Sequence, residues 1–503
     1  MSKKRIRLEK GGAKRKEERN LSKNKDEIPL KAAIPKTKFP PVQAKFTPES
    51  FQDKCSFIAE LSEAILQEPQ QAFVASRKDP NCVVSLNDDG ESVKCLNRMK
   101  RLIDMANQGG DYDKDKFASV EERHHVARLA MVSLVSIFGD ILPTYRIRPP
   151  TEAELSVKVS KDVRQLWEYE ASLLTHYQQF LNVLERTWES PLGKKSFPPQ
   201  ALGATAIMCL CELLKSASHF NFRSRILQTV VQTLNYNSSS WLAQKTQSLL
   251  KEGGGELYEG NGEITMETQD AHEINVQCCE ALSYVFKTDK QGDISLEAVR
   301  LLSKTLKDRK CRVHPLVLAT LKSLPLRVHE DEAAAAKLHA QVSKKKRKLH
   351  AANAQIEAEL NEKNATVDKG MLARSQAETL ELVTVMYFRV IQTASQELDD
   401  ASSEDQVNGA VKTHKSKKLS ATTLLLLPVA LEGLAKFTHL INMETVVDLL
   451  HFLKQLLQNV DLLPVDAALN CVLTAFQTLQ GPGRELPIDP KEYVTPLYFQ
   501  LPR

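Results

Sequence analysis

The stretch "ALGATAIMCLCELLKSASHFNFRSRILQTVVQTLN" (residues 201–235) decides the fold class. It follows a pair of prolines and contains two apolar runs, over about 200–217 and 222–235, joined by a short polar turn. The composition of both runs favours helix, and Asn221 in the turn is a residue type that commonly caps the start of a helix. The stretch therefore predicts a helical hairpin, the unit from which HEAT and armadillo arrays are built.

Similar helical segments continue on both sides of this hairpin. Apolar residues recur at helical spacing, and polar or glycine-containing stretches separate the apolar runs. The expected helices begin at Phe51 and then cover about 121–142, 160–186, 268–287, 295–307, 314–324, 371–394, 420–438, 443–459 and 465–479. No exact repeat period is found. We therefore predict an all-α fold: an irregular HEAT/armadillo-like helical-repeat solenoid with a disordered basic N-terminal tail.

Three expected helices carry an apolar stripe that should face the core. The stripe of the helix over 121–142 is Val126, Leu129, Ala130, Leu134, Ile137, Phe138 and Ile141, and its other side is apolar at Met131, Val132 and Val135. We expect this helix to be buried on most faces, with Phe138 and Ile141 in the core. The stripes of the other two are Phe51, Cys55, Ile58, Leu61 and Ile65, and Val163, Leu166, Leu173, Tyr177, Phe180 and Leu184.

Positive charge is concentrated at the N-terminus. The whole chain has a net charge of +5, whereas residues 1–48 contain 15 Lys and Arg against 5 Asp and Glu and so carry +10. A basic segment with few apolar residues stays unfolded and is attracted to polyanions. Two compatible interpretations remain, a solubilising or targeting tail and a contact with nucleic acid. The tail residues that we regard as candidate RNA contacts are Lys3, Lys4, Arg5, Lys14, Arg15 and Lys16.

A proline-rich segment, "PTYRIRPP" (143–150), follows the helix over 121–142, and we call it the elbow. Proline disfavours the helical conformation at the residue before it, and side chains alternate along an extended segment. Tyr145 and Ile147 should therefore anchor the elbow, while Arg146 and Arg148 face outward. The two arginines are candidates for a contact with RNA or with a partner protein.

The residues after the elbow allow a second interpretation of its arginines. Arg146 and Arg148 would then serve only to pair with nearby carboxylates such as Glu152. Thr151 and Glu154 lie three residues apart and have the pattern of a capping box for the next helix.

A second basic block occurs in the charged, helix-prone stretch over 328–366. It consists of Lys344, Lys345, Lys346, Arg347 and Lys348. Five consecutive cations occupy about 1.4 helical turns and cannot all be paired. The block is either a solvated helix face or a nuclear-localisation signal that also suits an RNA backbone.

The sequence gives no pattern that predicts an enzyme, a cofactor or a metal site. Phosphate-binding, dinucleotide-binding, nucleophile-elbow and zinc-protease motifs are all missing. The stretch 287–298 resembles a calcium loop but lacks its first ligand and its final glutamate, so Asp293 and Ser295 are expected to cap the next helix instead. His124 and His125 are adjacent and point in different directions on a helix. The nine cysteines are expected to be reduced and mostly buried.

Several longer stretches are similar to one known family. They are "LAMVSLVSIFGDILPTYRIRPPTEAEL" (129–155) with "VSKDVRQLWEYEASLL" (159–174) and "YQQFL" (177–181), "SHFNFRSRIL" (218–227), "ETLELVTVMYFRVI" (378–391), "LLPVALEGLAKFTHLINMETVVDLLHFLKQLL" (426–457) and "LNCVLTAFQTLQGPGRELPIDPKEYVTPLY" (469–498). In this order they resemble the nucleolar complex protein 3 family, over about residues 51–500. The family carries a longer basic N-terminal region and continues beyond the position matching Tyr498. The sequence is therefore expected to be a C-terminally short version.

The resemblance implies a non-enzymatic scaffold of the nucleus and nucleolus. It implies a role in assembly, maturation and intranuclear transport of pre-60S ribosomal particles, with nucleolar complex protein 2, pre-60S proteins and pre-rRNA as partners. We expect no cofactor, no small-molecule substrate and, since no long apolar run occurs, no membrane span. Two alternatives stay open, a chromatin-bound factor of DNA replication initiation and a generic HEAT-type adaptor.

Charge, helix pattern and resemblance together predict five regions. These are a disordered basic tail (1–48), an N-terminal helical region typical of the family (49–150), a helical-repeat region (151–327), a charged helical segment with the basic block (328–370), and a helical region resembling the start of a CCAAT-binding-factor-type domain (371–503).

Overall fold

The structure of the chain is a computed structural model. The structure describes residues 51–74, 84–85, 94–95, 97–107, 119–151, 154, 156–195, 200–236, 238, 241–246, 266–327, 369–403, 422–458, 463 and 465–500. By its internal contacts the chain divides into two units, Met1–Pro48 and Glu49–Arg503, and every described residue lies in the second. The expected disordered tail therefore lies outside the described residues.

The described part of the chain is built almost entirely from helices. The α-helices are α2 (Phe51–Gln67), α3 (Arg98–Ala106), α4 (Val120–Ile141), α6 (Lys161–Glu189), α7 (Ala201–Ser216), α8 (Arg223–Thr233), α10 (Met266–Thr288), α11 (Asp293–Asp308), α12 (Pro315–Thr320), α15 (Lys369–Ser403), α16 (Leu427–Phe437), α17 (Met443–Gln458), α18 (Val465–Gln480) and α19 (Lys491–Gln500). A π-helical turn, Thr422–Leu426, leads into α16, and short 3-10 turns extend α12, α16 and α18.

The predicted all-α class is confirmed. Each helix expected from the apolar pattern is present, and α15 extends well beyond the expected end at residue 394. The structure adds α3 and α19, which the sequence did not predict, and one antiparallel pair of two-residue strands, β1 (Val84–Ser85) and β2 (Lys94–Cys95). Among the described helices, none has the length and apolarity that crossing a membrane requires.

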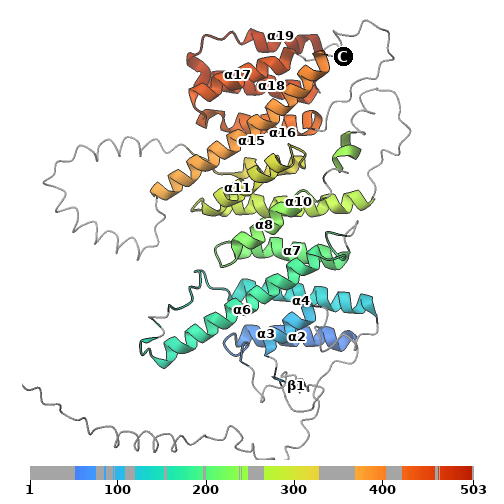
Figure 1. Ribbon diagram of the computed structural model, residues 1–503, viewed down its shortest axis with the longest axis vertical. Coiled ribbons are helices and arrows are strands. Elements are labelled where there is room, and N and C mark those ends of the chain that lie inside the picture. Colours follow the sequence, from blue (N-terminus) through green and yellow to red (C-terminus); the bar gives the residue numbers. More distant parts are fainter. Residues whose placement is uncertain are drawn as a thin grey trace, which may run out of the picture. The chain divides into compact units, whose positions relative to one another are not determined.

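Within Glu49–Arg503 the helices pack on their neighbours in sequence order (Figure 1). α2 and α3 pack on α4, and α4 and α6 pack on α7. α7 then contacts α8 and α10, and α8 contacts α11. The succession continues from α11 to α15, from α15 to α16, and from α16 and α17 to α18. Each helix is therefore stabilised by burial against the helices of the next layer.

The core between α4 and α6 is aromatic. Phe138 is fully buried, with its ring centroid 5.2 Å from that of Tyr177 and 5.5 Å from that of Phe180. The position expected for Phe138 is thus confirmed, and Ile141 is half-buried against the same core. Leu129 and Val132 were expected inside but are exposed, because no described helix covers that side of α4.

In two of the expected stripes, the apolar residues continue along the helix beyond the part of the helix that is buried. Val163 and Leu166 are exposed, although both lie on the apolar stripe of α6 that includes the buried Leu173. Phe51 at the start of α2 is likewise exposed. Helical periodicity reports which side of a helix is apolar, but not how far along the helix a neighbour reaches.

The turn before α11 is capped differently from the sequence prediction. Asp293 and Ser295 were expected to cap this helix, but the N-cap position is Gly292, with φ +77°. The Asp289 carboxylate accepts hydrogen bonds from the amides of Gln291, Gly292 and Ser295 and from the Ser295 hydroxyl. A carboxylate before the helix thus satisfies its first amides, which favours negative charge there.

The described cysteines agree with the expectation of free, mostly buried thiols. Cys55 is half-buried and the other six are buried. Burial raises the pKa of the Cys209 thiol to about 12. The Sγ atoms of Cys211 and Cys278 lie 3.7 Å apart between α7 and α10.

A buried histidine lies under a tryptophan at the start of α12. His314 is 1% exposed, its Nδ1 accepts a hydrogen bond from the Leu316 amide at 3.2 Å, and its Nε2 is 3.1 Å from Nδ1 of His272. The Trp241 ring packs on both imidazoles. Burial, and next the His272 charge, lower the pKa of His314 to about 3.

Stability should therefore fall as the pH decreases from about 6.5 to 3, because the unfolded chain binds the His314 proton and the folded chain does not. The contribution of one such group reaches about 1.4 kcal/mol per pH unit. His314→Asn keeps a side-chain oxygen for the Leu316 amide and should flatten the slope of unfolding free energy between about pH 4.5 and 6. Urea unfolding at several pH values measures the slope, with exposed His439→Asn as the control. An unchanged slope in His314→Asn would contradict the prediction.

Candidate functional site

The elbow begins where α4 ends. The amide of Leu142 still donates to the Phe138 carbonyl at 3.1 Å, but Leu142 itself is extended, with ψ 130°, before Pro143. A proline cannot continue the helical hydrogen bonding, which fixes the end of α4 at this point. From here the chain runs without regular structure to Thr151.

The side chain of Asn221, in the turn between α7 and α8, holds the middle of the elbow. The Ile147 amide donates to Asn221 Oδ1 at 2.9 Å, and Asn221 Nδ2 donates to the Ile147 carbonyl at 2.9 Å. The expectation that Asn221 caps α8 is therefore wrong. The N-cap of α8 is Phe222, with φ +64° and no side-chain cap hydrogen bond. The amide group of Asn221 instead matches the donor and acceptor of one extended residue.

His219 makes two further links between this turn and the elbow. Its Nε2 lies 3.1 Å from the Pro143 carbonyl oxygen, and its own carbonyl accepts a hydrogen bond from Arg146 Nε at 3.2 Å. Together with the two Asn221 bonds, these contacts attach three residues of the elbow, Pro143, Arg146 and Ile147, to one loop. We call residues 218–222 the dock.

The alternation of side chains expected in the elbow is confirmed in part. Ile147 is 5% exposed and belongs to the core, while Arg146 and Arg148 are exposed. Tyr145 is 53% exposed, so it does not anchor the elbow by burial. Its hydroxyl donates to Glu170 Oε1 of α6 at 2.6 Å, and this hydrogen bond is the first cause of a raised Tyr145 pKa.

Arg148 has a carboxylate partner, but a different one from that considered above. Its Nη2 lies 2.6 Å from Glu154 Oε1, whereas Glu152 lies outside the described residues. Glu154 also forms the expected capping box, since its Oε2 accepts from the Thr151 amide at 2.7 Å and its amide donates to Thr151 Oγ1 at 3.4 Å. The Thr151 amide, then its hydroxyl, then Arg148 hold the pKa of Glu154 below its usual range. The Arg148 pair is exposed, and such pairs contribute little stability.

Arg223, at the start of α8, adds a third arginine to this part of the surface. Its Nε lies 3.6 Å from Glu297 Oε2 of α11. Burial first and the Arg146 charge second lower the pKa of Arg223, which places Arg146 within electrostatic range of it. The elbow and the start of α8 thus bring together two cations that are 77 residues apart in sequence.

The remaining candidate residues lie outside the described part of the chain. These are Lys3, Lys4, Arg5, Lys14, Arg15 and Lys16 of the tail and the block Lys344, Lys345, Lys346, Arg347 and Lys348. Of the candidate cations that the structure describes, Arg146 contacts the dock and Arg148 contacts Glu154. Among described residues, no cluster of three or more His, Cys, Asp or Glu side chains could hold a metal ion.

Comparison with known proteins places the elbow inside a matched region. A family model described as a nucleolar complex-associated protein matches residues 54–180, which include the elbow. The nucleolar complex protein 3 homolog of Danio rerio is 33% identical over 396 residues, covering 75% of this chain and 42% of that protein. The Homo sapiens homolog is 30% identical over 475 residues, covering 90% and 48%. Nucleolar complex-associated protein 3 of Schizosaccharomyces pombe is 27% identical over 397 residues, covering 74% and 45%. The chain spans less than half the length of these relatives.

Proposed function

The chain belongs to the nucleolar complex protein 3 family, and on that basis we propose that it acts in the nucleolus as a non-enzymatic scaffold. Its proposed work is the assembly, maturation and intranuclear transport of pre-60S ribosomal particles, together with nucleolar complex protein 2. The observation that carries the proposal is the similarity to proteins of that name, which extends over 90% of the chain in the human comparison.

The proposed layout follows the five regions expected from the sequence. The basic tail (1–48) supplies loose affinity for pre-rRNA, and the block Lys344–Lys348 serves nuclear import or RNA contact. Residues 49–150, 151–327 and 371–503 supply stacked helices of a HEAT/armadillo-like type as surfaces for protein partners. The segment 328–370 connects the last two of these.

The elbow is proposed as an oriented contact to RNA or to a partner protein. Arg146 and Arg148 are exposed on a segment that the dock holds by four hydrogen bonds. A guanidinium held in this way loses little entropy on binding and can grip a phosphate or carboxylate with two hydrogen bonds. Arg148 would exchange its exposed partner, Glu154, for the ligand at small cost.

Sedimentation of nuclear extract tests the role in ribosome assembly. Tagged full-length chain should migrate with the pre-60S RNA in a sucrose gradient, and RNase treatment should shift it to lighter fractions. If the chain instead stays with chromatin after RNase treatment, the alternative function in replication initiation is favoured.

Removing both elbow arginines should weaken association with the particle without unfolding the chain. In Arg146→Ala/Arg148→Ala, an exposed ion pair and one hydrogen bond to a carbonyl are lost, so the free energy of unfolding should fall by less than about 2 kcal/mol. Association with the particle should weaken about tenfold, as for loss of charged hydrogen bonds. Arg146→Lys/Arg148→Lys keeps the charge without the planar fork and should recover only part of the binding.

The measurement is the amount of pre-60S RNA that co-purifies with each folded variant. A double alanine variant that unfolds at much lower denaturant but binds normally when folded would make the arginines purely structural.

A further inference from the structure

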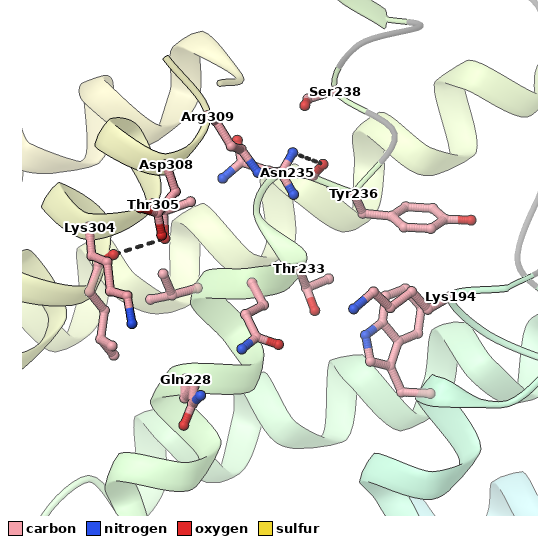
Figure 2. Close-up of a pocket in the computed structure, with 14 residues that line it drawn as sticks. Lys194, Gln228, Thr233, Asn235, Tyr236, Ser238, Lys304, Thr305, Asp308 and Arg309 are labelled. Carbon is pink, nitrogen blue, oxygen red and sulfur yellow. Dashed lines mark hydrogen bonds between the residues drawn. The ribbon is translucent and has the colours of Figure 1, made fainter. Parts of the chain in front are cut away.

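A polar pocket lies between the end of α8 and α11, away from the elbow's backbone contacts. Its volume is about 640 Å³, and its walls come from the turn after α6, from α8 and the residues following it, and from α11. Lys304 of α11 and Lys194 of the turn after α6 lie on opposite sides of it (Figure 2). Amide and hydroxyl side chains line it between them, from Gln228, Gln232, Asn235 and Thr305.

Positive charge is in excess along the end of α11 and the residues that follow it, beside this pocket. The lining from this part of the chain holds two exposed cations, Lys304 and Arg309, and one acid, Asp308. Three more exposed cations of the stretch 304–312 lie outside the lining, namely Lys307, Lys310 and Arg312. Arg309 Nη1 also donates to the Asn235 carbonyl at 3.4 Å. None of these cations forms an ion pair with a carboxylate among the described residues. Unpaired cations gathered along about two turns of chain attract a polyanion.

The backbone just after α11 is strained beside two of these cations, Lys310 and Arg312. Lys310 and Cys311 have φ +50° and +60°, in the left-handed region that side chains other than glycine rarely adopt. Cys311 is 1% exposed, and its amide donates to the Leu306 carbonyl at 3.1 Å. Insertion of Cys311 into the core turns Lys310 and Arg312 toward solvent. Such strain often occurs at functional sites.

Two buried polar side chains of the pocket have atoms without a hydrogen-bond partner. Asn235 is 2% exposed; its Oδ1 accepts from the His314 amide at 3.2 Å, but its Nδ2 donates to no described group. Ser238 is 1% exposed, and its Oγ has no partner either. Buried donors without acceptors are uncommon and destabilising, so an acceptor from a bound ligand would remove a cost that the folded chain otherwise carries.

We propose that this pocket and the basic stretch 304–312 bind a segment of single-stranded RNA. Phosphates would lie along the α11 cations and Lys194, and an unpaired base would enter the pocket beside the half-buried Tyr236 ring, where Asn235 and Ser238 donate to it. Duplex RNA does not fit, because its bases are stacked inside the helix. An acidic peptide would pair with the cations, but it would offer no aromatic base to the Tyr236 ring and the amide side chains of the pocket. The site is independent of the elbow and does not require the proposed role in pre-60S assembly.

Fluorescence anisotropy with the full chain and a labelled oligouridylate of about 12 nucleotides tests the basic wall. Lys304→Gln/Lys307→Gln should weaken binding about tenfold near 0.15 M salt and reduce the slope of log affinity against log salt by about 1.4, as for two lost phosphate contacts. Lys290→Gln/Lys491→Gln removes two other exposed lysines and the same charge, and should change both values much less. Equal weakening by the two pairs would show an effect of net charge alone and overturn the proposal.

Ser238→Ala tests the pocket without disturbing an existing hydrogen bond. Because Ser238 Oγ is unpaired in the folded chain, the variant should be as stable as the parent or slightly more stable, yet bind the oligouridylate about twofold to tenfold more weakly. Unchanged RNA affinity in this variant would exclude a base in the pocket. If an oligoglutamate peptide of equal charge binds the parent more tightly than the RNA does, the site is one for an acidic protein segment. The elbow variant should retain this RNA affinity.

Discussion

Replacing Phe138 with alanine is expected to lower the free energy of unfolding by about 3–5 kcal/mol. The Phe138 ring is fully buried between Tyr177 and Phe180 of α6, and its removal leaves a cavity that these two rings cannot fill without leaving their own contacts. The loss combines the transfer of the ring to water with the cost of that cavity. Urea unfolding followed by circular dichroism measures it.

Val132→Ala is the matched control for this prediction. Val132 lies on the same helix but is 51% exposed, so its truncation should change the free energy of unfolding by less than about 0.5 kcal/mol. A loss below about 1 kcal/mol for Phe138→Ala would mean that α4 presents a different side to α6.

Asn221→Ala should lower the free energy of unfolding by about 2–6 kcal/mol and release the elbow. The substitution leaves the amide and the carbonyl of the buried Ile147 without their partners, and each unpaired buried group costs about 1–3 kcal/mol. The rate of hydrogen exchange at the Ile147 amide should rise by the factor that corresponds to this loss of free energy. The same variant should weaken particle association, because Arg146 and Arg148 then lose their fixed orientation.

Ser224→Ala, three residues along in the first turn of α8, provides the control. Ser224 is exposed, so its replacement should leave both stability and exchange at Ile147 unchanged. Slow exchange at Ile147 in Asn221→Ala would show that other contacts suffice to hold the elbow.

The helices of this chain could be predicted from sequence because each is a local pattern. The spacing of apolar residues over 121–142 gave α4, and the two runs over 201–235 gave α7 and α8. The pattern does not indicate which other helix packs against each of them. Leu129 and Leu166 therefore looked like core residues and are exposed, since burial depends on where the adjacent layer ends.

The elbow was predictable in its conformation but not in its partners. Prolines restrict the backbone locally, and this gave an exposed pair of arginines around a buried Ile147. Asn221 lies 74 residues further along, and its position in a turn suggested a helix cap. Only the packing of α4 on α7 brings that amide to the elbow. The single sequence signal was a polar residue between Phe220 and Phe222.

The order of packing described for Glu49–Arg503 has a consequence for synthesis of the chain. The contacts of α2, α3, α4, α6, α7 and α8 described above are made with helices nearby in the order of the chain, none further along than α11, so each requires closure of a loop of limited length. A nascent chain can thus complete one layer before the next has left the ribosome. At any time during translation, the exposed apolar surface that later helices will bury then belongs only to the most recently formed layer. This limits the chance of aggregation.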